Sequence, residues 1–151
     1  HFKKREDLIA AVEEKLDKEL IDALDRTFAQ RESFDDATDL SKEDLSLLKI
    51  RIQQMLRDGA TKDPLIAHHR KLFRWHQKHG HMRDGLEPNI TAIITASASL
   101  VGLFLALSGA NTDEERAVLA KRFRKTYKTF IFEGIFNSAA KAEWPPPPEL
   151  R

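Results

Sequence analysis

The feature that most constrains the fold is an uncharged run at residues 90–107. A helix that is apolar on every side must be enclosed by other helices, and a chain of 151 residues has few with which to enclose it. The next helix, expected over residues 113–136, has an apolar face wider than one neighbour would cover. We therefore expect a helical hairpin, joined at residues 108–111, that packs against a second copy of the chain.

The same run reaches the length at which a membrane span must be considered. It contains Thr91, Thr95, Ser97, Ser99 and Gly102, however, and no basic or aromatic belt flanks it. We therefore interpret it as a buried helix of a cytoplasmic protein without a membrane partner.

Composition favours an all-α fold in a single domain and argues against enzymatic chemistry. Glycine and proline are scarce outside turns, and β-branched residues do not alternate. The chain has no cysteine, and 25 basic against 24 acidic side chains give a formal net charge of +1. The sequence has no glycine-rich phosphate loop, nucleophile elbow or Glu-x-x-His pair. We predict a protein that is not an enzyme and that carries no cofactor.

Apolar periodicity predicts five helices, at residues 5–28, 41–58, 63–79, 89–108 and 113–136. Ser41 is the expected cap of the second, and Gly59 its end. Asp63 and Pro64 form the start of the third. Thr112 and Glu115 form a capping box at the last. Residues 29–39 have the polar, aperiodic character of a loop, and four consecutive prolines give the tail, 141–151, a polyproline II conformation.

Two short motifs resemble those of tetracycline-repressor (TetR) family regulators. The first is similar to the junction at which the recognition helix of the helix-turn-helix ends and the next helix begins, with matches at His1, Phe2, Arg5, Glu6 and Leu8. The second resembles the turn before the family's eighth helix, with matches at Gly80, Arg83, Leu86 and Pro88.

The resemblance implies a TetR-like C-terminal regulatory domain, with antiparallel helices and a C-terminal hairpin that forms a four-helix dimer interface. Residues 1–140 would be the effector-binding and dimerisation domain, and residues 1–8 the junction to a helix-turn-helix domain that this sequence lacks. The implied function is that of a ligand-responsive repressor. A small apolar or amphipathic effector would shift the helix at 5–28 and release operator DNA.

The expected site residues fall into three sets. The helices that line the family's ligand pocket correspond to residues 41–58, 63–79 and 89–108, and their in-facing candidates are Met55, His69, Phe73, His76, Thr95, Ser99 and Phe104. The candidates for the homodimer interface are Leu100, Leu103, Phe123, Tyr127, Phe130, Ile131 and Ile135. Phe132 and Phe136 lie towards the polar edge of the same helix, which strengthens the case for a partner. The candidates for DNA phosphate contacts are His1, Lys3 and Lys4.

Two other functions remain open on the sequence alone. His69, His76 and His79 lie near one helical face, a spacing that zinc and nickel sites use, so a histidine-based metal sensor is one alternative. Cationic side chains surround them and the helix carries no carboxylate after Asp63, so we assign no metal site. The other alternative is a free-standing helical adaptor whose exposed aromatic residues and proline tail bind another protein.

Overall fold

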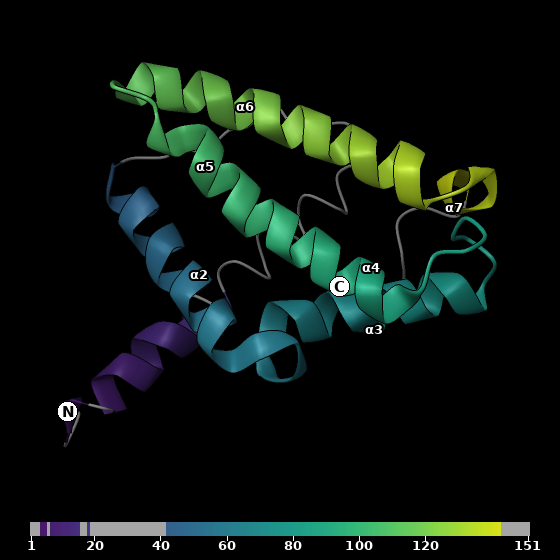
Figure 1. Ribbon diagram of the computed structural model, residues 1–151, viewed down its shortest axis with the longest axis horizontal. Coiled ribbons are helices and arrows are strands. Elements are labelled where there is room, and N and C mark those ends of the chain that lie inside the picture. The colour runs from purple at the N-terminus through teal and green to yellow at the C-terminus, as the bar shows by residue number, and fades with distance from the viewer. Residues whose placement is uncertain (1–3, 6, 16–17, 19–41, 143–151) are drawn as a thin grey trace.

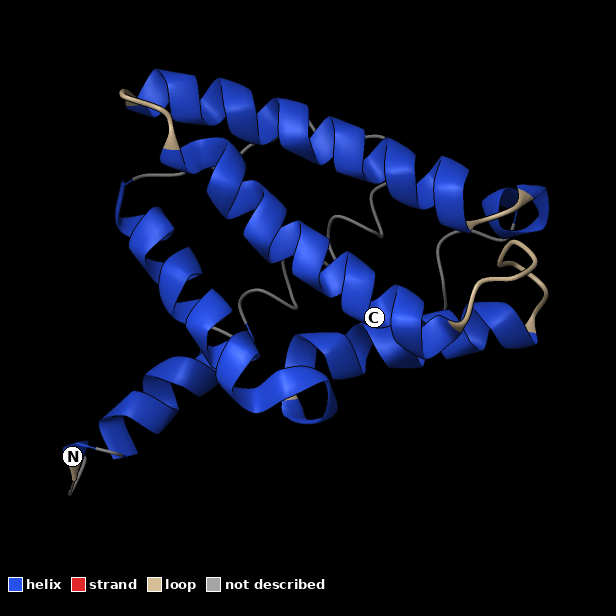
Figure 2. Ribbon diagram, in the orientation of Figure 1, coloured by secondary structure: helices blue, strands red, loops and turns tan. Residues whose placement is uncertain are grey.

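The computed structural model describes residues 4–5, 7–15, 18 and 42–142, all of them helical except for short turns. The helices are α2 (Lys42–Lys62), α3 (Pro64–Lys78), α4 (Pro88–Ser97), η1 (Ala98–Gly102), α5 (Leu103–Ser108), α6 (Asp113–Thr129), η2 (Phe130–Ile135) and α7 (Ser138–Ala142) (Figures 1 and 2). Within this part of the chain there is no strand, only an isolated antiparallel bridge between Met82 and Phe136. The all-α prediction is confirmed.

The predicted helix boundaries agree with the structure to within a few residues. Gly59, expected to end the second helix, breaks it instead: its φ of 65° and ψ of −179° are not helical, and one further turn follows to Lys62. Residues 5, 7–15 and 18 of the predicted first helix are helical. The rest of that helix, the loop at 29–39, the Ser41 cap and the tail at 143–151 lie outside the described residues.

Side-chain caps fix where three of the helices begin. The Asp63 carboxylate accepts a hydrogen bond from the Ile66 amide at 3.0 Å. The Glu87 carboxylate accepts one from the Ile90 amide at 2.8 Å, and the Thr112 hydroxyl accepts one from the Glu115 amide at 3.1 Å. These bonds satisfy amides that have no partner inside a helix. The caps predicted at Asp63 and Thr112 are thereby confirmed.

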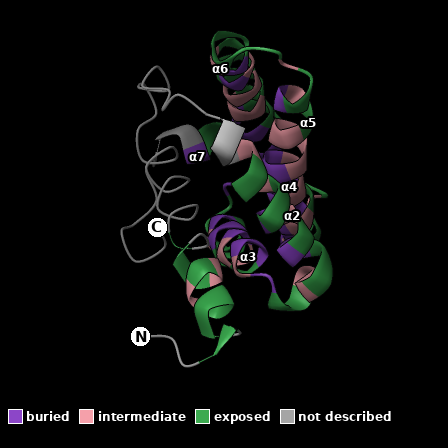
Figure 3. Ribbon diagram, turned by 90° about the vertical axis from the view of Figure 1, so that its left-hand side faces the viewer, coloured by how far each residue is buried: buried purple, intermediate pink, exposed green. Residues whose placement is uncertain are grey.

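The uncharged run forms the central helix of the molecule. α4, η1 and α5 continue into one another as a single helix that runs diagonally between α3 and α6 (Figure 1). α4 packs chiefly on α3, while α5 packs on α6 and α2. Buried residues gather on α3 and on the inner sides of its neighbours, and α6 carries many exposed ones (Figure 3). Length and composition alone would let this helix cross a membrane, and 39% of its most apolar window is buried.

In the described residues the core contains two apolar clusters, and α3 and α4 contribute side chains to both. One joins α3 and α4 to η2 and the residues after it and consists of Phe73, Met82, Ala92, Ile131, Phe132, Ile135, Phe136 and Ala140. The other joins α2 to the middle of the central helix and consists of Met55, Leu65, Ile66, Ala96 and Leu100. α3 contributes side chains to both and so holds the two halves together.

The central helix has a π-helical turn, η1, that sequence periodicity did not predict. At this turn Gly102 allows the Phe123 ring of α6 to approach closely, because a Cβ atom there would lie 2.8 Å from Phe123 Cε2. The ring is held in place by stacking on Tyr127, with a centroid distance of 5.9 Å and an interplanar angle of 9°.

We expect Gly102→Ala to lower the free energy of unfolding by about 1–2 kcal/mol, as overpacking does, despite the better helix propensity of alanine. Gly109→Ala is the control, because Gly109 has a negative φ and no atom lies within 4 Å of the added Cβ. Urea unfolding of both variants gives the comparison. Equal stability of Gly102→Ala and Gly109→Ala would contradict the close approach.

Candidate functional site

The predicted ligand-lining residues meet on both sides of the α3–α4 contact. His69, Phe73 and His76 share one face of α3 and are buried, and so are Thr95 and Ser99 on the helix opposite. Met55 is buried on α2, whereas Phe104 is only half-buried on α5. Phe73 and Met55 belong to the two apolar clusters, and the rings of His69 and His76 pack on those of Phe73 and Phe136.

An open hollow lies elsewhere, at the turn between α5 and α6. It is lined mainly by apolar surface from residues that include Ala110, Val118 and Leu119. None of the predicted ligand-lining residues contributes to it.

His69 is a neutral imidazole in the described core. Its Nδ1 atom lies 2.9 Å from the Leu65 carbonyl oxygen. A carbonyl oxygen can only accept, so Nδ1 carries the hydrogen. Burial lowers the pKa of His69 to about 4, although the hydrogen bond to Leu65 opposes this shift.

A second buried imidazole, His76, faces His81 across the α3–α4 turn. Their Nδ1 atoms are 3.1 Å apart, so one donates and the other accepts. Burial, followed by the neighbouring His81 and His79, lowers the pKa of His76 to about 3. The Trp75 and Phe136 rings cover the pair, with centroids 4.9 Å and 4.5 Å from that of His76.

The turn that carries His81 is fastened to the end of the α6 helix. The Asn137 amide donates to the His81 carbonyl at 2.9 Å, and the Arg83 amide donates to the Ile135 carbonyl at 2.9 Å. Asn137 Nδ2 also donates to the Gly80 carbonyl at 2.6 Å. We call these contacts the Asn137 clamp.

The histidines do not form a metal-binding cluster in the part of the chain that the structure describes. There, no group of three or more histidine, cysteine, aspartate or glutamate side chains is placed to hold a metal ion. His79, the third residue of the histidine pattern, is exposed, and its Nδ1 lies 2.8 Å from the Trp75 carbonyl oxygen.

The two neutral histidines should make the fold sensitive to acid. An unfolded chain protonates histidine near pH 6.5, whereas folded His69 and His76 resist protonation until about pH 4 and about pH 3. The unfolded state therefore binds more protons than the folded state below pH 6.5. As the pH is lowered through this range, the free energy of unfolding decreases by up to about 1.4 kcal/mol per pH unit for each histidine.

Urea unfolding between pH 7.5 and pH 5 measures this slope. We expect His69→Asn to remove about half of it, because the asparagine amide replaces the Nδ1 donor without titrating. Gln77→Asn, at an exposed position of α3 that carries no titratable group, is the control and should leave the slope unchanged. A wild-type stability that is flat over this range would contradict the assignment.

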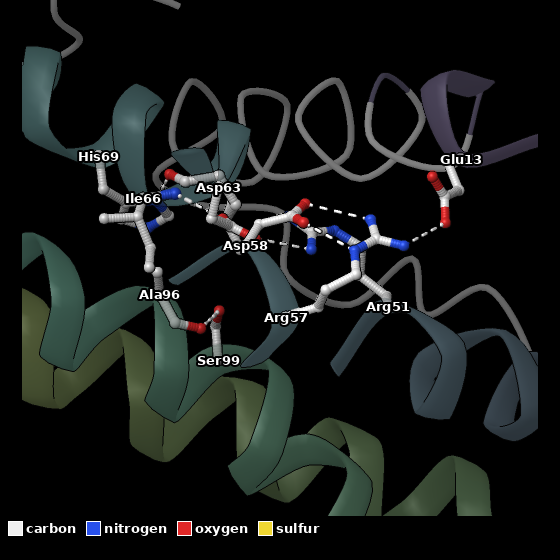
Figure 4. A network of polar contacts seen from close by, with 10 residues as sticks. Glu13, Arg51, Arg57, Asp58, Asp63, Ile66, His69, Ala96 and Ser99 are labelled. Carbon is white, nitrogen blue, oxygen red and sulfur yellow. Dashed lines mark hydrogen bonds and ion pairs between the residues drawn. The ribbon is translucent and has the colours of Figure 1, made fainter. Parts of the chain in front are cut away.

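A buried ion pair holds α2 against the start of α3. Arg51 Nη1 lies 2.8 Å from Asp63 Oδ2, and both side chains are buried. The other Asp63 oxygen caps α3, so one carboxylate serves two elements (Figure 4). Nearby, Arg57 on the exposed side of α2 contacts Glu13 at 3.1 Å, which links the N-terminal helix to α2.

The predicted interface residues divide by exposure. Leu100, Ile131 and Ile135 are buried within the chain and have almost no surface left for a partner. Leu103, Phe123 and Tyr127 are half-buried, and Phe130 is 49% exposed. The expectation that Phe132 and Phe136 lie towards a polar edge is wrong: both pack in the core cluster that joins α3 to the end of the α6 helix.

The hairpin nevertheless exposes large apolar side chains, and those on the central helix were not among the predicted interface residues. On the central helix Ile90, Ile94 and Leu105 are 55%, 53% and 64% exposed. Ile90 and Ile94 are four residues apart and lie on one face of α4, whereas Leu105 is on α5, beyond η1. Val118 and Phe130 are about half exposed on α6. We call these five residues the hairpin face.

Of the residues predicted to contact DNA phosphates, only Lys4 lies within the described part of the chain. It is exposed, and its carbonyl accepts a hydrogen bond from the Leu8 amide at 3.4 Å. His1 and Lys3 lie outside the described residues. Contact with DNA stays a prediction.

Periodicity missed the polar contacts that cross between helices. It did not indicate the pairing of Arg51 with Asp63, the His76–His81 contact, or the 2.8 Å hydrogen bond from the Tyr127 hydroxyl to the Thr95 carbonyl. Each joins residues whose proximity depends on the packing of whole helices. The one sequence signal was indirect: polar residues on the otherwise apolar faces of their helices.

The described residues thus form an α-helical fold in which the central helix and α6 make a hairpin with exposed apolar side chains. In comparisons with known proteins, no family model, curated protein or solved structure matches the chain. The resemblance to TetR-family regulators rests on the two short motifs and the order of the helices.

Proposed function

We propose that the chain is the effector-binding and dimerisation domain of a ligand-responsive transcriptional repressor of the TetR type. The order of the elements supports this function, because α2, α3, the central helix and α6 follow in the order and approximate lengths that the resemblance implies. The second motif lies in the α3–α4 turn, and the described residues of the first, Arg5 and Leu8, are in the N-terminal helix.

The hairpin face is the observation that carries the proposal. Single exposed apolar residues are ordinary, whereas several on two adjacent helices mark a surface for association. A second copy is the occupant that we propose, because a two-fold axis across the hairpin places the central helix and α6 of both copies in one four-helix bundle.

The effector would enter between α2, α3 and the central helix. The lining is largely apolar, and His69, Thr95 and Ser99 supply a few hydrogen-bonding groups, as in most small-molecule sites. The ion pair between Arg57 and Glu13 then offers a route from α2 to the N-terminal helix. A helix-turn-helix domain outside this sequence would release operator DNA, provided that the effector binds the two states with different affinities.

Native mass spectrometry and thermal unfolding of the purified chain test the proposal together. We expect the mass of a dimer. We also expect certain apolar compounds from a panel to raise the melting temperature in proportion to the logarithm of their concentration. Polar compounds of the same size are the control. A monomer unaffected by every apolar compound would contradict the function.

A further inference from the structure

The central helix departs from α-helical geometry at one place, and that place touches α6. η1 spans Ala98–Gly102, between two α-helical stretches. A π-helical turn holds an extra residue, is rare, and occurs often at functional positions. It needs support from its surroundings, because the α-helical alternative is available to the same residues.

That support comes from Tyr127 on α6. Its hydroxyl donates a hydrogen bond of 2.8 Å to the Thr95 carbonyl, just before η1, and it also contacts the Ser99 hydroxyl. Burial raises the pKa of Tyr127, so the hydroxyl stays protonated and remains a donor. The stacked Phe123 ring lies against Gly102, at the other end of the turn.

The two ends of this contact belong to different surfaces. Thr95 and Ser99 are on the buried side, next to the α3–α4 packing. Phe123 and Tyr127 are on α6, the helix that also carries Val118 of the hairpin face. If η1 relaxed to an α-helix, α5 would rotate by about 100° relative to α4, the rotation that one residue represents. Leu105, which is 64% exposed, would then change its direction relative to Ile90 and Ile94.

We propose that Tyr127 is a positioning residue that holds η1 in its π register and thereby couples the central helix to the position of α6. The π register of η1 and the position of α6 change together, because the Tyr127–Thr95 hydrogen bond and the contact of the Phe123 ring with Gly102 hold both. The role of this coupling in carrying an effector signal to the dimer interface rests on the proposed function. The coupling within one chain is independent of that function.

Hydrogen exchange measured by mass spectrometry on the whole chain tests the proposal with Tyr127→Phe, which removes only the hydroxyl. We expect the amides of residues 96–103 and of 123–131 to exchange about fivefold faster, the change that loss of one hydrogen bond of ordinary net strength gives. Amides in α3, at residues 65–76, should keep their wild-type rates. Thr129→Val is the matched control, because the Thr129 hydroxyl bonds only within its own helix, to the Lys125 carbonyl.

Three results would overturn the proposal. The first is an unchanged rate at 96–103 in Tyr127→Phe. The second is faster exchange there that leaves 123–131 unaffected. The third is a uniform acceleration that includes α3, which would indicate only a general loss of stability. A wild-type chain that is monomeric would contradict the proposed function instead, and the exchange rates would still decide the role of Tyr127.

Discussion

Ile94→Glu is expected to convert a stable dimer into a folded monomer. Ile94 belongs to the hairpin face and is 53% exposed, so a carboxylate there stays hydrated in the monomer. In the dimer the same carboxylate would be buried without a partner, and two-fold symmetry would bury it twice. A buried unpaired charge costs about 3 kcal/mol or more, which raises the dimer dissociation constant at least about a hundredfold. Light scattering over a dilution series measures it.

Leu56→Glu provides the matched control for this experiment. Leu56 is also aliphatic and is 73% exposed, but it lies on α2, away from the hairpin face. The control should remain dimeric, and circular dichroism should show that both variants keep their helices. If the wild type is a well-folded monomer, the regulator is the wrong function, and the hairpin face belongs to a different protein partner.

Asp63→Ala is expected to cause the largest loss of stability, about 4 kcal/mol. The substitution removes the carboxylate beside a buried guanidinium, which typically costs 3–5 kcal/mol, and it also removes the cap of α3. Arg51 is 4% exposed and cannot recover the lost interaction by turning to water without disturbing α2. Chemical denaturation by urea gives the difference.

Two further variants separate the contributions of charge and cap. Asp63→Asn keeps an oxygen that can accept from the Ile66 amide, so it should lose less stability than Asp63→Ala. Asp58→Asn breaks an ion pair of similar length, 2.8 Å to Arg57. That pair is exposed to solvent, where ion pairs contribute little. Equal losses for Asp58→Asn and Asp63→Asn would show that burial of the pair is unimportant.

Helix limits followed from the sequence because their causes are local. Asp63 and Thr112 cap helices through amides three residues away, and Gly59 breaks α2 through its own φ angle. The burial of His69, Phe73 and His76 also followed, since they recur on one helical face. These features depend on residues close together in the chain.

The features that sequence could not predict depend on three-dimensional packing. Phe132 and Phe136 are core residues because the α6 helix ends in the π-helical segment η2 and the chain then turns back at the Asn137 clamp. Periodicity assumes a continuous α-helix and therefore gives the wrong face for them. The hairpin face was likewise assigned mainly to α6, although its most exposed side chains are on the central helix.

The Asn137 clamp has a consequence for how the hairpin moves. It joins the Met82 and Gly80 carbonyls to a side chain 55 and 57 residues further along the chain, while the turn at residues 109–112 closes the opposite end. The central helix and α6 are therefore two sides of a closed ring, and neither can swing about a single hinge. Closing such a ring has an entropic cost that is met once, on folding. In the folded protein, a displacement of the central helix therefore displaces α6 as well, and the reverse also holds.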